Sequence, residues 1–269
     1  VEELLNDAAY LAEEPKLVCR RACPLDGRWR QMPERFGPMK VALKFYEGGY
    51  IDQVLDYADQ CVELAGKRRP GYERVNAAEF HYFAGTLHEG RDNKRDAVAA
   101  YQQAVNSNPD YREAHRNLAR IYLEQGKAKQ AVPHLRQAMR LSEKDAETLF
   151  SLGLALDASG NKQGAADAFA GVLVLRPAWP AALNNLAWIL ATNEPPLGDG
   201  GKAVELGEQL CKATRFGEPV ALNTLAAAYA QSGDFVQAQR YSSQAEKLFE
   251  ERGDQAAAQE TATRIILYG

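Results

Sequence analysis

Apolar residues recur along the chain at helical spacing, and the pattern itself repeats about every 34 residues. Four segments align in one register, with position 1 at Ala78, Arg112, Ala146 and Pro219. Small residues recur at positions 8, 20 and 27: Gly85, Ala119, Gly153, Ala226; Ala97, Ala131, Ala165, Ala238; Ala104, Ala138, Val172, Ala245. Bulky residues recur at position 11 and, in three of the segments, at position 24. This pattern predicts two helices per segment that pack closely where the side chains are small.

Glycine also recurs at position 15, as Gly126, Gly160 and Gly233. Each of these glycines follows the first predicted helix, where a residue of positive φ commonly ends a helix. Each segment therefore predicts a helix, a short turn and a second helix. A single hairpin of this kind cannot bury its apolar face, so the hairpins must stack.

These residues resemble the tetratricopeptide repeat family, whose period is 34 residues. The resemblance runs from Arg35 to the C-terminus and implies an all-α, right-handed superhelical solenoid of about six hairpins with capping helices. The expected repeats are near 35–68, 78–111, 112–145, 146–179, 180–218 and 219–252, together forming a solenoid over 35–252. The copy at 180–218 is degenerate and carries a longer loop at Asn193–Gly201. Residues 1–34 are expected to form a helix and an irregular cap or join, and residues 253–269 a capping helix.

The block that starts LNNLAWILATNEPP resembles the C-terminal repeat module of bacterial envelope-associated or multi-domain tetratricopeptide proteins. This resemblance suggests a bacterial source and a larger parent chain. The first residue is Val1, so either a leader has been removed or the chain is a piece of something larger. The compartment stays open between cytoplasm and envelope, with an inclination to the periplasm or cell envelope.

Composition and motifs argue against several function classes. The net charge is −4, from 32 Lys and Arg against 36 Asp and Glu, which disfavours nucleic acid as a partner. No apolar stretch approaches the roughly 18 residues of a membrane span. The HExxH, GxSxG and phosphate-loop motifs are lacking, so neither an enzyme nor a bound metal or cofactor is expected. Cys19 and Cys23 form either a local disulfide or two free thiols, and Cys61 and Cys211 are expected to be small buried residues.

The resemblance also implies a concave groove lined by the first helix of each repeat. Transferring the groove positions gives Tyr82, Phe83, Arg116, Asn117, Arg120, Phe150, Asn184, Asn185, Trp188 and Asn223. Asn117 and Asn185 could hydrogen-bond an extended peptide backbone, and the aromatic residues could anchor apolar side chains. Arg116 and Arg120 could hold an acidic group. The alternative interpretation is that Asn184, Asn185 and Trp188 only satisfy packing between repeats.

The predicted function is a non-enzymatic scaffold that holds a peptide segment or partner subunit in its groove and so assists assembly of a complex. A chaperone C-terminal tail is not favoured, because only one repeat carries basic residues at groove positions 5 and 9. One alternative is the repeat module of a larger enzyme or membrane protein with its chemistry elsewhere. A third hypothesis is self-association through an exposed end of the repeat stack.

Overall fold

The computed structural model describes residues 55–56, 60, 63, 76–142 and 144–267. This part of the chain contains eleven helices and no strand, so the predicted all-α fold is confirmed there. The segment 1–34, with Cys19 and Cys23, lies outside the described residues, as do Cys61 and most of the first expected repeat at 35–68.

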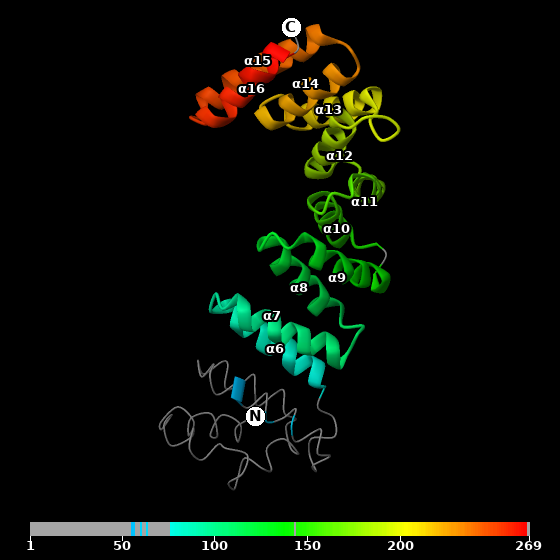
Figure 1. The fold of residues 1–269 in the computed structure, drawn as a ribbon, viewed down its shortest axis with the longest axis vertical. Coiled ribbons are helices and arrows are strands. Elements are labelled where there is room, and N and C mark those ends of the chain that lie inside the picture. The colour runs from blue at the N-terminus through cyan, green and yellow to red at the C-terminus, as the bar shows by residue number, and fades with distance from the viewer. Residues whose placement is uncertain (1–54, 57–59, 61–62, 64–75, 143, 268–269) are drawn as a thin grey trace, which may run out of the picture. The chain divides into compact units, whose positions relative to one another are not determined.

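The chain divides into two compact units, Val1–Ile121 and Tyr122–Gly269. In the first unit, α6 (Ala77–Gly90) and α7 (Lys94–Ser107) form a hairpin, and α8 (Arg112–Glu124) begins. The remaining helices belong to the second unit (Figure 1): α9 (Ala128–Leu141), α10 (Ala146–Ala158), α11 (Lys162–Leu175), α12 (Pro180–Thr192), α13 (Gly200–Ala213), α14 (Pro219–Gln231), α15 (Phe235–Glu251) and α16 (Gln255–Leu267).

The helices of the second unit stack in chain order. The pairs α10–α11, α12–α13 and α14–α15 are hairpins, and each hairpin packs on the next through the contacts α11–α12 and α13–α14. The first helices α12 and α14 also contact each other. This stacking of hairpins is the solenoid architecture that the register predicts.

Local sequence fixes where the helices begin and end. Asn93, Asp145, Asn161 and Asp234 precede helices, and the side-chain oxygen of each accepts a hydrogen bond from a backbone N–H of the first turn. The glycines at position 15 have φ values of +70°, +90° and +85°, which confirms the expected left-handed conformation after the first helix.

Two of the hairpins are held by an aromatic ring that lies directly on a glycine. A Cβ atom added to Gly85 would lie 2.5 Å from Cε1 of Tyr101, and one added to Gly153 would lie 2.6 Å from Cε1 of Phe169. Both rings are fully buried. The small residue at position 8 therefore makes room for the bulky residue at position 24 of the facing helix. Where position 8 is alanine, position 24 is the smaller Leu135 or Ser242.

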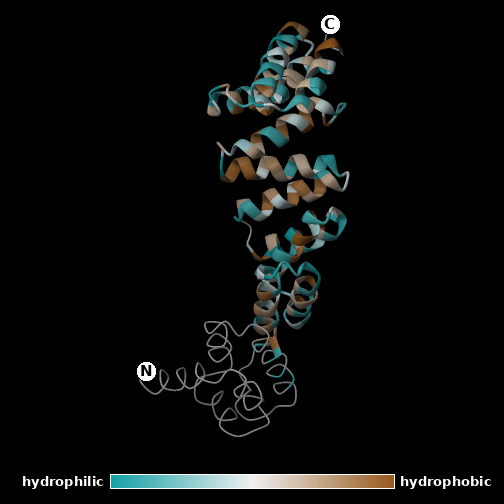
Figure 2. Ribbon diagram, turned by 90° about the vertical axis from the view of Figure 1, so that its left-hand side faces the viewer, coloured by the Kyte–Doolittle hydropathy of each residue, from teal (hydrophilic) through white to brown (hydrophobic). Residues whose placement is uncertain are grey.

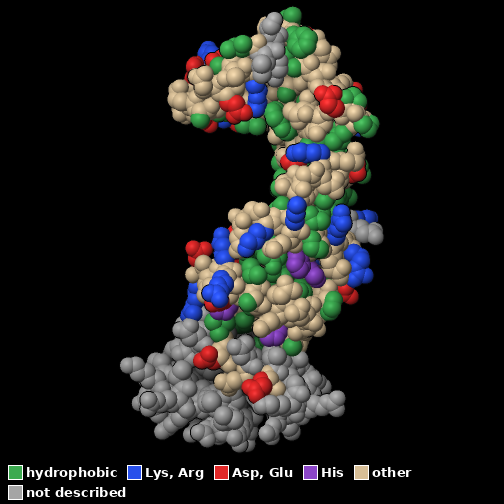
Figure 3. Space-filling view, viewed as in Figure 1, with side chains coloured by type: hydrophobic (Ala, Val, Ile, Leu, Met, Phe, Trp, Pro, Cys, Tyr) green, Lys and Arg blue, Asp and Glu red, His purple; other side chains and the backbone are tan. Residues whose placement is uncertain are grey.

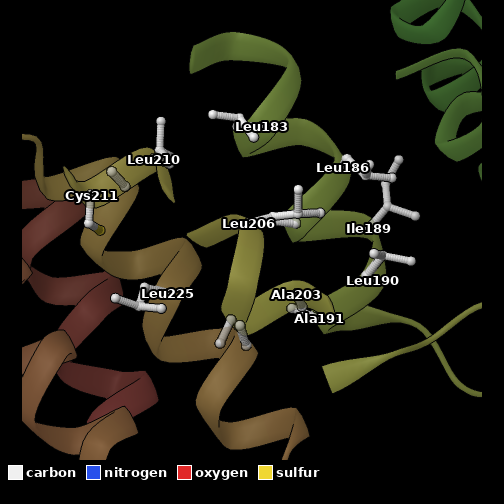
Figure 4. Packing of buried hydrophobic residues seen from close by; sticks show 14 of the residues in the cluster. Leu183, Leu186, Ile189, Leu190, Ala191, Ala203, Leu206, Leu210, Cys211 and Leu225 are labelled. Carbon is white, nitrogen blue, oxygen red and sulfur yellow. The ribbon is translucent and has the colours of Figure 1, made fainter. Parts of the chain in front are cut away.

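Stacking produces one continuous core in the second unit. Figure 4 shows part of this core, with leucines of α12, α13 and α14 and with Cys211 of α13. Cys211 is a buried free thiol, as expected from its place in the register. Figure 2 shows hydrophobic and hydrophilic residues alternating along the helices, which is the pattern of helices with one buried face.

Replacing Gly153 by alanine tests the ring-on-glycine contact. The added methyl group overlaps the Phe169 ring, so we expect Gly153→Ala to lower the free energy of unfolding by about 1–3 kcal/mol. Gly90→Ala is the control, because a Cβ there has no neighbour within 4 Å. Urea unfolding followed by circular dichroism measures both. Equal stability of the two variants would show that Phe169 does not depend on Gly153.

Ala165 tests the small residue at position 20 in the same way. Its side chain is fully buried in α11, so Ala165→Leu overpacks the core and should cost about 1–3 kcal/mol in the same unfolding measurement. Ala158→Leu, at an exposed position in α10, is the matched control and should be nearly neutral. A neutral Ala165→Leu would contradict the register.

Candidate functional site

The face of α12 brings together three of the predicted groove residues: Asn184, Asn185 and Trp188. All three are half-buried. The Oδ1 atom of Asn184 accepts a hydrogen bond of 2.8 Å from the hydroxyl of Thr224 on α14. The Nδ2 atom of Asn185 donates to the carbonyl of Ala181 in its own helix, also at 2.8 Å. Each amide thus uses one side and leaves the other, the Nδ2 of Asn184 and the Oδ1 of Asn185, with hydrogen-bonding capacity.

The same kind of link joins α14 to α16. Asn223 donates through Nδ2 to the hydroxyl of Thr261 at 2.9 Å, and this hydroxyl donates to the carbonyl of Ala257 at 2.8 Å. The Oδ1 atom of Asn223 is buried and has no hydrogen-bond partner. Asn184 therefore connects α12 to α14, and Asn223 connects α14 to α16. For Asn184 this is the kind of contact that the packing interpretation proposes.

Trp188 contacts the last helix of the chain. The guanidinium of Arg264 on α16 lies over the indole ring, 5.0 Å from its centroid. Glu260, one turn earlier in α16, pairs with the same guanidinium. A cation over the face of tryptophan is an attractive contact, and it fixes the indole at the side of α12 where Asn185 also lies.

Phe150 on α10 belongs to an aromatic stack. Its ring lies 5.5 Å from that of Phe169 and 5.0 Å from that of Trp179, with a near-parallel stack on the tryptophan. Arg176 covers the indole of Trp179 and reaches Glu147 at 3.4 Å. One turn beyond Phe150, the side chain of α10 is Leu154, which is 37% exposed. This face of α10 therefore presents Phe150 and Leu154 beside the polar Glu147 and Ser151.

The first unit has a different, polar arrangement around Tyr101. The Tyr101 hydroxyl donates to Glu89 at 2.7 Å and accepts from Nδ2 of Asn117 at 3.1 Å. Arg120 forms an ion pair with the same Glu89. The Arg120 guanidinium is therefore already matched by a carboxylate, which weakens the hypothesis that Arg116 and Arg120 together hold an acidic group.

Two further tyrosines extend this arrangement. The ring of Tyr82 lies 5.5 Å from that of Tyr101 and 5.1 Å from that of Tyr111. Burial raises the pKa of Tyr82 and of Tyr101, and raises the pKa of Tyr111 to about 12. All three hydroxyls are therefore protonated hydrogen-bond donors at neutral pH. Phe83 and Arg116 are half-buried on α6 and α8.

Several contacts of these faces go beyond the predicted groove contacts. Thr224 takes the same repeat position as Asn117 and Asn185, where it interrupts the asparagine series, and Arg264 lies in the expected capping helix. Tyr101 was recognised as a packing residue, without a role for its hydroxyl. The sequence signal for the stack on Phe150 is the aromatic residue at repeat position 34, Trp179. Tyr111 occupies the same position two repeats earlier and contacts Tyr82 in the same way.

Where the structure describes side chains, no group of three His, Cys, Asp or Glu is placed to hold a metal ion. Burial raises the pKa of the Cys211 thiol to about 12, so this thiol is not a nucleophile at neutral pH. None of the described helices is both long and apolar enough to cross a membrane.

Comparison with known proteins places the repeats in a family. Two family models, both described as tetratricopeptide repeat, match residues 74–144 and 117–182. No curated protein matches the sequence.

Solved structures share the fold at low identity. The MamA protein is 22% identical with a TM-score of 0.58, over 66% of this chain and 94% of MamA. YrrB, described as a TPR protein with an unusual peptide-binding site, is 21% identical with a TM-score of 0.58, over 72% of this chain and 93% of YrrB. The C-terminal part of a TPR repeat-containing protein from Cytophaga hutchinsonii is 18% identical with a TM-score of 0.58, over 90% and 94%.

These identities show a common fold and nothing finer. Tetratricopeptide repeats are generally non-catalytic modules of protein interaction, so the matched repeats support a protein-interaction scaffold. Residues 74–182 of the chain belong to the tetratricopeptide repeat family.

Proposed function

We propose that the chain holds an extended, largely uncharged peptide segment of a partner protein against the first helices α10, α12 and α14, and so assists assembly of a larger complex. The observation that carries this proposal is the face of α12, where Trp188 lies one helical turn from two amides that each keep one hydrogen-bonding side.

The chemistry of this face matches an extended peptide. A peptide backbone in extended conformation presents both N–H donors and carbonyl acceptors. The Nδ2 atom of Asn184 can donate to such a carbonyl, and the Oδ1 atom of Asn185 can accept from such an N–H. Trp188 is a side chain of the type that contributes most to interface affinity.

The character of the bound segment follows from the neighbouring side chains. Phe150 and Leu154 on α10 add apolar surface, and Ser151 donates to the carbonyl of Glu147 within its helix. The cation nearest to Trp188, Arg264, already pairs with Glu260. We therefore infer a segment that carries apolar side chains in place of an acidic tail.

Self-association remains a separate hypothesis. The outer side of α16 exposes Gln259, Glu260 and Thr263, which are polar as a terminal cap requires, although Ile266 is 79% exposed. A polar surface of this kind is better suited to contact with water than to packing against a second copy of the chain. The proposal therefore rests on the first-helix faces.

Peptides selected from a randomised display library against the intact chain provide the probe for a test. We expect Trp188→Ala to weaken binding of the selected peptides by roughly thirtyfold, the size of a typical hot spot, and Asn185→Ala to weaken it by roughly fivefold. Fluorescence anisotropy of labelled peptides measures both affinities, and thermal unfolding confirms that the variants are folded.

Gln244→Ala, at an exposed position of the second helix α15, is the control and should leave affinity unchanged. Selected peptides that bind the Trp188→Ala and Asn185→Ala variants as tightly as the original chain would overturn the proposal. A consensus dominated by Asp and Glu among the selected peptides would contradict the inferred character of the segment.

A further inference from the structure

The second helix α9 carries a line of cations that the proposed peptide site does not use. Lys129, Arg136 and Arg140 are separated by seven and four residues, so they lie on one face of the helix, about 10.5 Å and about 6 Å apart along its axis. All three are exposed. We refer to these three residues as the basic stripe.

No carboxylate lies within the helix that carries the stripe, and Glu124 and Glu143 flank it in the sequence. Between Gln125 and Ser142 the sequence has four Lys or Arg residues and no Asp or Glu. Arg140 donates to Gln137 at 3.1 Å. Lys129 and Arg136 make no ion pair with any residue that the structure describes. Figure 3 shows several Lys and Arg side chains around the position that Figure 1 gives to α9.

Six of the eleven other Lys and Arg residues in the second unit form an ion pair that the structure describes. Each of the six pairs with a carboxylate: Lys162, Arg176, Lys212, Lys247, Arg252 and Arg264. The positive charge of the stripe also contrasts with the net charge of −4 of the chain. A local excess of one sign on a chain of the opposite sign attracts a complementary surface at short range, within a Debye length of about 8 Å at physiological salt.

The second helices α11 and α15 do not repeat the stripe, although α15 carries two cations at the matching positions. The matching positions of α11 hold Gln163, Asp167 and Ala170 together with Val174, and those of α15 hold Val236, Arg240, Ser243 and Lys247. A solvent-exposed helix face does not require three cations in line. The repeat architecture alone therefore does not account for the stripe.

A proline stands in the middle of the stripe. Pro133 is exposed, four residues after Lys129 and on the same face. It has no N–H to donate to the Lys129 carbonyl, and prolines in helix interiors are costly for this reason. Its ring is short, so it covers less of the helix surface between Lys129 and Arg136 than a long side chain would. The face therefore combines three cations with an accessible centre and a backbone acceptor.

We propose that the basic stripe of α9 is a second docking surface, and that its occupant is an acidic segment of a protein partner. Carboxylates spaced along such a segment match the separate cations, and a backbone N–H of the segment can donate to the Lys129 carbonyl. Duplex nucleic acid and an anionic membrane fit less well, because α9 exposes no aromatic or large apolar side chain to stack on bases or enter a bilayer. This surface is independent of the proposed peptide site.

The test uses the intact chain and a fluorescein-labelled oligoglutamate peptide, with oligoglutamine as the uncharged counterpart. We expect oligoglutamate to bind and Lys129→Glu/Arg136→Glu to lower its affinity at least roughly tenfold at about 0.15 M salt. The matched control, Arg240→Glu/Lys247→Glu, makes the same change in net charge on α15 and should change affinity less than about twofold. Lys129→Gln/Arg136→Gln should give an intermediate loss.

Three results would overturn the proposal. Equal losses in the two charge-reversed variants would assign the effect to net charge alone. Equal binding of oligoglutamate and oligoglutamine by the original chain would remove the site. Tighter binding of duplex DNA or phosphatidylserine vesicles, lost in the same variant, would assign the stripe to a different occupant. Trp188→Ala should leave oligoglutamate binding unchanged, which separates this test from that of the peptide site.

Discussion

The contact of an aromatic ring with a glycine on the facing helix is the constraint on which the hairpin geometry depends. Tyr101 lies on Gly85 and Phe169 lies on Gly153, each so closely that a single added carbon would overlap the ring. This approach sets the distance between the two helices of a hairpin. Small buried residues at positions 20 and 27 then allow the next hairpin to pack on it.

The position of the proposed binding face follows from that packing. Because α12 and α14 contact each other, Thr224 can reach Asn184 across forty residues of sequence. Asn223 of α14 likewise reaches Thr261 of α16, and Arg264 of α16 lies over Trp188 of α12. These contacts fix the side chains of the first helices, so the face is presented to a partner without a large loss of side-chain freedom on binding.

The sequence predicted the fold more completely than the site. Helix ends followed from Gly126, Gly160 and Gly233, and hairpin packing followed from alanines and glycines in register, because these are local or strictly periodic signals. The partners of the asparagines could not be predicted. Whether Asn184 faces a ligand or Thr224 depends on the separation of two helices, which no spacing in the sequence encodes. Likewise, the ion pair of Arg120 with Glu89 joins residues 31 positions apart.

The two surfaces proposed for the second unit differ in chemistry as well as in place. The first-helix face offers Trp188, Phe150 and amide groups, and its cation Arg264 is already paired. The second helix α9 offers Lys129 and Arg136, whose charge is not matched by the described residues. A scaffold with an uncharged site and a basic site can hold two different segments at once, which is a physical basis for assembling a complex.

The central claim is that hairpin geometry depends on the fit between positions 8 and 24. A double-mutant cycle with Gly153→Ala and Phe169→Leu measures this dependence, because the double variant reproduces the alanine–leucine combination of Ala119 and Leu135. The account predicts that the free energy of unfolding of the double variant exceeds the additive expectation by about 1 kcal/mol or more. Additivity within about 0.5 kcal/mol would contradict it.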